Sequence, residues 1–385
     1  MKRILTLLLA CTMTAALLSG CAKQETASDP LQAALDAYAP DTVVMTIDGT
    51  QVHWNEFAYW LCTTAKQFAR DAGVPVIEDW NAVYDEQTGE TYADVLLRTV
   101  TEQLKQFHSL EAQAADFGLE PGADGDAYVE QSVAESLSKV PLGDGEDSDK
   151  ALKRFYLDRD VLRYQARIAY LYLLVYQELF GADGEKLSED DLNDYVAQKG
   201  YMTAKHILLS TADSSNQPLP DDVKAEKLET AKRIIERLRK IEDPAELVRE
   251  FDRYAGEYNE DPGVASYPNG YCFCTGQMDP AFEAGTAALQ PYEVSPEPVE
   301  SAYGYHVILR MPTTGDEALD VNADGTPYTL QSDAAQAIYE QLIRAWIDDA
   351  EVQWAEGFET LDVQALFTGE ETFLEKLDFL HWFHD

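Results

Sequence analysis

Two histidines, His206 and His306, each lie in a short apolar run of the kind that forms β-strands. Between them, Met278 and Phe282 are four residues apart near a helix start, where both side chains reach the same face. The three segments read Ala-Lys-His-Ile-Leu-Leu (204–209), Gly-Gln-Met-Asp-Pro-Ala-Phe-Glu (276–283) and Tyr-Gly-Tyr-His-Val-Ile-Leu (303–309). Taken singly, a strand histidine is most often structural, and such an apolar pair is often core.

In this order and at these separations, the three segments resemble the signature of the parvulin peptidyl-prolyl isomerases, over about residues 200–312. The resemblance implies a small antiparallel sheet flanked by helices. It also implies a hydrogen-bonded pair of catalytic histidines beneath an apolar proline slot. The residues at the matching positions are His206 and His306 for the pair, and Met278, Phe282 and the aromatic Phe273 for the slot.

The resemblance adds two polar positions to the expected catalytic set. Ser301 matches a hydroxyl residue that joins the histidine network, and Asp261 matches a position held by Cys or Asp in the family. A carboxylate at Asp261 can tune the histidines, or it can cap the turn before Pro262-Gly263. The chain departs from the family at 267–273, where Tyr-Pro-Asn-Gly-Tyr-Cys-Phe replaces a glycine-rich turn.

The reaction that the resemblance implies is rotation about a prolyl amide, whose uncatalysed barrier is ~18–20 kcal/mol. A dry apolar slot favours the twisted amide, which has less charge separation than the planar one. No cofactor or metal is therefore expected. The loop at 211–220 contains no Arg or Lys, so we expect no preference for phosphorylated substrates.

The segments on either side of this domain have mainly helical periodicity, strongest at 150–180 and resumed at 332–356. The opening strand, Asp48-Gly49 turn and following helix resemble the chaperone lobe of exported parvulin foldases of the PrsA/SurA group. We therefore expect an α+β protein whose mainly helical chaperone lobe is built from both ends of the chain, with the parvulin domain inserted. The expected divisions are 41–199 (N-terminal helical lobe), 200–312 (parvulin) and 313–385 (C-terminal helical part).

The N-terminus has the pattern of a lipoprotein signal peptide at 1–20, followed by a linker at 21–40. Lys2 and Arg3 precede an apolar stretch, and Leu18-Ser19-Gly20-Cys21 looks like a lipobox. The alternative is an ordinary secretory signal with a chance cysteine. We expect a diacylated Cys21, since two acyl chains suffice for stable anchoring, and hence an extracytoplasmic lipoprotein on the cell membrane.

A net charge of −41 argues against binding to nucleic acid or anionic lipid, although it can equally reflect solubility outside the cell. The expected partners are unfolded exported polypeptides, and the sequence leaves a homodimer open. Asp320, Asn322 and Asp324 match the opening of a calcium loop, but Gln331 stands where a bidentate Glu is usual. A plain turn is the alternative there.

Two functions compete at this point. One is an active prolyl isomerase and foldase for exported proteins, which the histidines and the slot residues favour. The other is a non-catalytic chaperone with a degenerate parvulin domain, which the altered 267–273 segment would allow. A solute-binding lipoprotein has no support, because no alternating α/β pattern is present.

Overall fold

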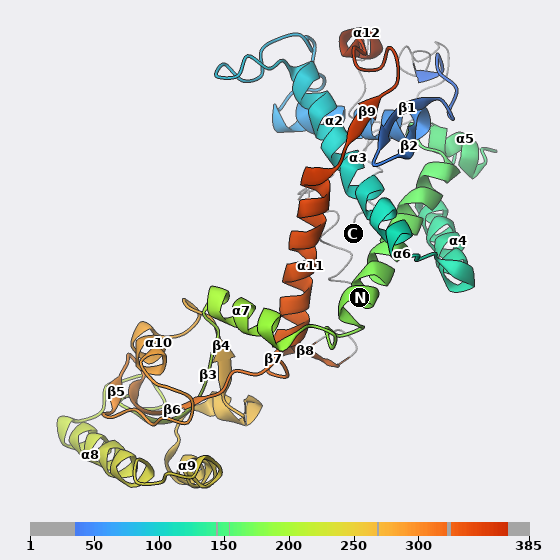
Figure 1. The fold of residues 1–385 in the computed structure, drawn as a ribbon. Coiled ribbons are helices and arrows are strands. Elements are labelled where there is room, and N and C mark those ends of the chain that lie inside the picture. The colour runs from blue at the N-terminus through green and yellow to red at the C-terminus, as the bar shows by residue number, and fades with distance from the viewer. Residues whose placement is uncertain (1–34, 144, 154, 268, 322–324, 369–385) are drawn as a thin grey trace. The chain divides into compact units, whose positions relative to one another are not determined.

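The computed structural model describes residues 35–143, 145–153, 155–267, 269–321 and 325–368, and it is an α+β fold (Figure 1). The chain divides into two compact units, each described here by itself. The first unit combines both ends of the chain, Met1–Glu178 and Tyr339–Asp385, and the second is the intervening segment Leu179–Ile338. Two helices, α6 and α11, each run across one of these two division points.

A three-stranded antiparallel sheet of order β2-β1-β9 joins the two ends of the chain within the first unit. Its strands are β1 (Val43–Ile47), β2 (Thr50–His53) and β9 (Val352–Trp354). Asp48 and Gly49 both have positive φ, of 48° and 80°, which suits the tight turn between β1 and β2. Met45 pairs with Trp354 across the sheet, so the N- and C-terminal segments share one set of backbone hydrogen bonds.

Helices form the rest of the first unit, and their apolar faces meet over the sheet. The helices are α2 (Trp54–Asp71), α3 (Tyr92–Asp116), α4 (Gly122–Lys139), α5 (Ser148–Lys153), α6 (Arg159–Phe180) and α12 (Val363–Phe367), with α11 (Leu330–Asp349) entering from the second unit. Thr91 and Asp94 form a capping box at the start of α3. The ring of Tyr339, on α11, lies 4.8 Å from that of Tyr172, on α6, and its hydroxyl donates to the Tyr172 carbonyl.

Two expected helices differ from the structure. The helix expected over 150–180 is broken into α5 and α6, and Tyr156 in the break has φ of 55°. Asp158 begins the second helix by accepting from the Val161 N–H, and its other oxygen accepts from Asn55 on α2. The helix expected over 332–356 ends at Asp349, and Trp354 lies in β9, because pairing with β1 outweighs the helical periodicity.

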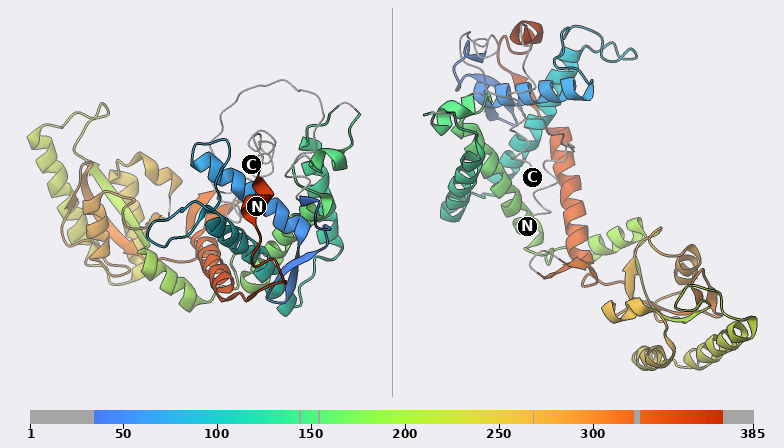
Figure 2. Two further views of the ribbon diagram at one scale, coloured as in Figure 1. Left: turned by 90° about the horizontal axis from the view of Figure 1, so that it is seen from above. Right: turned by 180° about the vertical axis from the view of Figure 1, so that it is seen from behind.

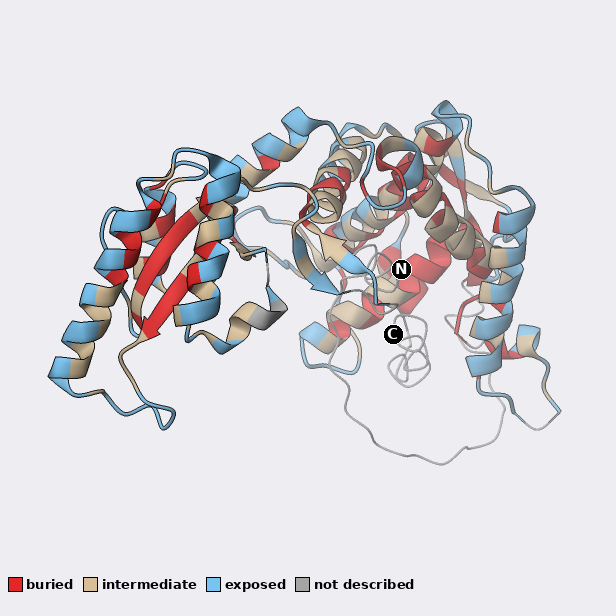
Figure 3. Cartoon of the chain, turned by 90° about the horizontal axis from the view of Figure 1, so that it is seen from below, coloured by how far each residue is buried: buried red, intermediate tan, exposed pale blue. Residues whose placement is uncertain are grey.

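The second unit is built around an antiparallel sheet of order β4-β3-β6-β5. The two central strands are buried along most of their length (Figure 3). The elements of the unit are α7 (Glu189–Lys199), β3 (Met202–Ser210), α8 (Asp221–Leu238), α9 (Pro244–Tyr258), the 3-10 helix η1 (Pro262–Ser266), β4 (Tyr271–Phe273), α10 (Pro280–Ala287), β5 (Val299–Glu300), β6 (Gly304–Met311), β7 (Ala318–Val321) and β8 (Pro327–Thr329).

Each face of this sheet carries its own apolar cluster. Helices α8 and α9 lie on one side and α10 on the other (Figures 1 and 2). Alternate residues of β3 and β6 supply the first cluster, which includes Ile207, Leu209, Val307 and Leu309. The opposite face is completed by α10, through Phe282. Since side chains alternate along a strand, the face toward α10 also receives both strand histidines.

Asp333, in the first turn of α11, ties together the segments that enter and leave the sheet of the second unit. Its carboxylate accepts hydrogen bonds from the hydroxyls of Tyr195 (2.7 Å), Tyr201 (3.2 Å) and Tyr328 (3.0 Å). Residues 179–199 and 313–338 accordingly belong to the same compact unit as the sheet. The functional boundaries at 199–200 and 312–313 remain predictions.

Candidate active site

The register of β3 against β6 brings His206 and His306 together. His206 is opposite Ile308, and His306 is opposite Leu208, so the histidines are diagonal neighbours on one face. Their Nδ1 atoms lie 3.1 Å apart, and their rings are stacked with centroids 5.2 Å apart. Residues a hundred positions apart in sequence therefore form one hydrogen-bonded pair.

The hydrogen bonds of the pair continue on both sides. His206 Nε2 lies 2.8 Å from an oxygen of Asp261, and His306 Nε2 lies 2.6 Å from Ser301 Oγ. The hydroxyl of Tyr271 donates to the same oxygen of Asp261 at 2.6 Å. The structure thus links the four polar residues singled out in the sequence into one chain; their catalytic roles remain predictions.

The hydrogens along this chain can be assigned in two ways. The Asp261 carboxylate accepts, so His206 Nε2 carries a hydrogen. The bond between the two Nδ1 atoms carries one hydrogen, on either ring. If His206 supplies it, His306 is a neutral imidazole; if His306 supplies it, His306 is neutral when its Nε2 accepts from the Ser301 hydroxyl.

The electrostatics agree with a neutral His306. Burial, with a smaller contribution from His206, lowers the pKa of His306 to about 4. The hydrogen bond from His206 is the largest of the effects that hold the pKa of Asp261 well below its ordinary value. The Tyr271 hydroxyl and the Gly263 N–H act in the same direction, against burial. Asp261 is therefore a carboxylate at neutral pH, and it caps η1 through Gly263. Its tuning of the histidines stays a prediction.

Phe282, one of the residues predicted to form the proline slot, lies directly on the histidines. The Phe282 ring has its centroid 5.2 Å from those of both His206 and His306. Asp279 caps α10 and Pro280 opens it, which fixes the position of Phe282 in the first turn. Met278 is partly buried against the same cluster, whereas Phe273 is 1% exposed and packs behind Phe282 at 5.6 Å. Phe273 thus supports the slot from below.

Three further residues position this site and were not foreseen from the sequence. Asn259 accepts from the N–H groups of Leu208 and Asp261 and donates to the His206 carbonyl, which holds the Asp261 segment against β3. Glu283 accepts from the N–H groups of Gly276 and Met278, which orders the start of the slot. Tyr271 is the third. In the sequence, the only sign of these three residues was that each is polar and stands next to one of the motifs.

The altered 267–273 segment supplies Tyr271. Gly270 has φ of 106°, and a Cβ there would lie 2.8 Å from the Ala204 carbonyl oxygen, so the tight approach to β3 requires glycine. The next residue then places its ring 5.4 Å from His206 and its hydroxyl on Asp261. Tyr267 packs on Tyr271 with centroids 4.6 Å apart and is 45% exposed. The departure from the family pattern thus extends the site.

The remaining candidates from the sequence are the lipidation cysteine and the residues of the calcium-loop pattern. Cys21, Asn322 and Asp324 fall outside the described residues. Asp320 lies in β7, and the side chain of Gln331 donates to the Gly184 carbonyl at 2.9 Å. In the part of the chain that the structure describes, no group of three or more His, Cys, Asp or Glu is arranged to hold a metal ion.

Residues 206–311 match the family model described as Rotamase: PPIC-type PPIASE domain. This segment is a parvulin-type rotamase domain. Two relatives are each called Foldase protein PrsA. The one from Halalkalibacterium halodurans is 45% identical over 83 residues, which are 21% of this chain and 22% of the relative. The one from Geobacillus kaustophilus is 36% identical over 125 residues, which are 32% of this chain and 36% of the relative.

These two matches cover only a minor part of either chain. The chain spans between about a fifth and about a third of the length of these curated relatives. A crystal structure of PrsA from Bacillus subtilis is 21% identical over 81% of this chain and 90% of that one, with a TM-score of 0.23. No helix among the described residues is both long enough and apolar enough to cross a membrane.

Proposed function

We propose that this protein is a peptidyl-prolyl cis-trans isomerase and foldase for exported polypeptides. The observation that carries the proposal is the hydrogen-bonded pair of His206 and His306 directly beneath Phe282, within a parvulin-type rotamase domain. The complete polar chain from Ser301 to Asp261 supports activity over the non-catalytic alternative. The names of the curated relatives agree with a foldase.

The catalytic part of the proposal needs only residues of this chain. The proline ring would lie against Phe282 and Met278, where water is excluded and the twisted amide is favoured. Beneath the proline ring, the hydrogen bond between the two histidines would hold their rings in place, and the ring of His306 would carry no charge. Because no bond is made or broken, neither a nucleophile nor a redox group is required.

The test is turnover of a cis-Ala-Pro peptide by the purified protein. Met278→Ala should lower kcat/KM about ten-fold, because losing ~1.4 kcal/mol of transition-state packing costs that factor. Met278 is preferred to Phe282, which is 4% exposed and whose loss would also cost stability. The matched control is Met311→Ala, since Met311 packs against the cluster on the opposite face of the sheet.

Equal turnover by the parent and a folded Met278→Ala variant would contradict the placement of the slot. No turnover by the parent itself would favour the non-catalytic chaperone instead. Loss of activity in Met311→Ala but not in Met278→Ala would point to a packing effect on the whole domain.

We also propose that the protein is a lipoprotein anchored through Cys21 at the outer face of the cell membrane. The lipobox-like Leu18-Ser19-Gly20-Cys21 after an apolar stretch supports this. Membrane attachment would then depend on two acyl chains. Mass spectrometry of the mature N-terminus should find an acylated Cys21, and an unmodified terminus further downstream would refute the anchor.

A further inference from the structure

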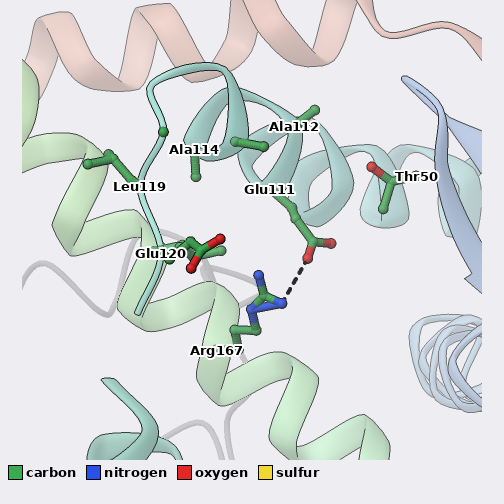
Figure 4. Close-up of a pocket in the computed structure, with 10 residues that line it drawn as sticks. Thr50, Glu111, Ala112, Ala114, Leu119, Glu120 and Arg167 are labelled. Carbon is green, nitrogen blue, oxygen red and sulfur yellow. Dashed lines mark ion pairs between the residues drawn. The ribbon is translucent and has the colours of Figure 1, made fainter. Parts of the chain in front are cut away.

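A hollow of about 360 Å³ lies in the first unit (Figure 4). Its walls are the C-terminal half of α3, the turn that follows it, one residue of β2 and the facing side of α6. The volume falls at the lower end of the range typical for ligand sites, ~300–1,000 Å³. The apolar part of the wall includes Ala112, Ala114, Leu119 and Leu171.

Three charged side chains face this hollow, and only two of them pair with each other. Glu111 and Arg167 form an ion pair of 3.2 Å across it. Glu120, from the turn after α3, is exposed on the same hollow, and among the described residues none pairs with its carboxylate (Figure 4). The C-terminal end of α3 also carries partial negative charge, and its last turn contains no basic residue. The net charge at the hollow is therefore negative.

A chain of hydrogen bonds behind the hollow holds the Glu111 carboxyl group in place. One of its oxygens accepts from the Tyr164 hydroxyl at 3.1 Å, and that hydroxyl also lies 3.1 Å from His108 Nδ1. Tyr164 has a single hydrogen, so when it donates to Glu111 its bond with His108 needs Nδ1 as the donor. His108 is 1% exposed and lies 3.1 Å from Glu56, so the chain continues into the core of the first unit.

The charged groups that line the hollow set its net charge. Glu111 and Arg167 cancel each other, and Glu120 remains as an uncompensated carboxylate. An anionic ligand would meet this carboxylate and the helix C-terminus, whereas a cationic ligand would be stabilised by both.

We propose that this hollow binds the cationic side chains, lysine or arginine, of an unfolded client polypeptide. The inference rests on the proposed foldase function and adds the chemistry by which the first unit selects its clients. The aliphatic stem of the side chain would pack on the alanine and leucine wall, with its charged end between Glu111 and Glu120. A chain of net charge −41 also attracts basic segments at longer range.

The test uses the purified full chain and two dye-labelled, unfolded synthetic peptides. Both peptides lack proline, so that the isomerase slot cannot account for binding. One carries four lysines, and the other has the same four lysines acetylated, which removes the charge. Fluorescence anisotropy should give tighter binding of the unmodified peptide, with a difference that shrinks as salt is added.

Two substitutions should act in opposite directions. Glu120→Gln should weaken binding of the lysine peptide about two- to five-fold, the range expected for one exposed ion pair. Arg167→Gln should tighten it by a similar factor, because it removes the competing cation from Glu111. The control is Asp126→Asn, an exposed carboxylate on α4 outside the hollow, which should change nothing.

The outcomes separate this inference from the foldase proposal. Equal binding of both peptides by the parent would overturn the cationic site and leave the foldase proposal standing. Weaker binding of the lysine peptide by Arg167→Gln, with circular dichroism unchanged, would contradict the assignment of Arg167 as a competing cation and overturn the cationic site. Binding of neither peptide would likewise overturn the cationic site, whereas the foldase proposal is decided by turnover of the proline peptide. If Arg167→Gln fails to fold, the substitution of the exposed Glu120 by Gln still decides. Unchanged binding of the lysine peptide by Glu120→Gln would refute the site.

Discussion

At the scale of residues, the protonation of His306 is the feature that depends most on burial. Its side chain is 4% exposed and neutral, and its pKa is lowered to about 4 mainly because burial disfavours the charged form. An unfolded chain would bind a proton at the same residue near pH 6.5. Below that pH the unfolded state binds more protons than the folded state, so the domain loses stability as the pH is lowered.

The parvulin domain should therefore lose stability between about pH 6.5 and pH 4. The expected loss from His306 alone is ~2–3 kcal/mol at pH 4.5, from a pKa lowered to about 4 against ~6.5 in the unfolded chain. Asp261 adds to the acid sensitivity only below about pH 4, because an unfolded Asp binds its proton there while the folded-state pKa of Asp261 lies lower. Hydrogen exchange of the β3 and β6 amides, measured across this range, reports the stability of this domain.

The control for this prediction is a comparison of two histidine substitutions. His306→Gln should flatten the loss of protection above pH 4.5, since no buried imidazole is left to titrate. His53→Gln, at the end of β2 in the other unit, should leave the profile unchanged. A parent domain equally protected at pH 6.5 and 4.5 would contradict the assignment of a buried neutral His306.

At the scale of elements, strand pairing and capping decide what periodicity leaves open. The apolar runs around His206 and His306 are strands, as expected, but their antiparallel register is what makes the imidazoles neighbours. Over 150–180 the apolar pattern is continuous, yet Tyr156 adopts positive φ and Asp158 caps a new helix. Asn55, a hundred residues earlier, holds that cap, so the break depends on a tertiary contact.

The C-terminal segment illustrates the same rule. Helical periodicity predicts a single helix over 332–356, but α11 ends at Asp349 and three residues pair with β1 instead. A strand of three residues carries too little pattern to be recognised by itself. Its pairing with β1 satisfies backbone groups that would otherwise be left at the edge of the sheet.

At the scale of the whole molecule, the first unit contains both ends of the chain, and we predict that it works without the middle. The cut points at 178 and 339 are close within this unit, since the rings of Tyr176 and Tyr339 lie 5.5 Å apart. Replacing residues 179–338 by a short Gly/Ser linker should therefore leave the unit closed. Circular dichroism should find a folded helical protein that suppresses aggregation of an unfolded client.

The matched control is the same linked protein truncated after residue 338 of the original numbering. It lacks β9 and the α11 segment that packs on Tyr172, so it should not fold. An unfolded linked protein would refute the idea of one lobe built from two chain ends. A folded protein that fails to hold clients would refute its chaperone role.

The sequence alone determined the parvulin signature, the two strand histidines and the α+β class, because each depends on residue types at short, regular spacings. The slot residues that it also indicates stay a prediction. Only the tertiary structure decided which polar groups meet. Asn259, Tyr271 and Glu283 hold the site through bonds that local periodicity does not encode. The neutral state of His306 and the negative balance beside Glu111 likewise arise from burial and from contacts across several helices and strands.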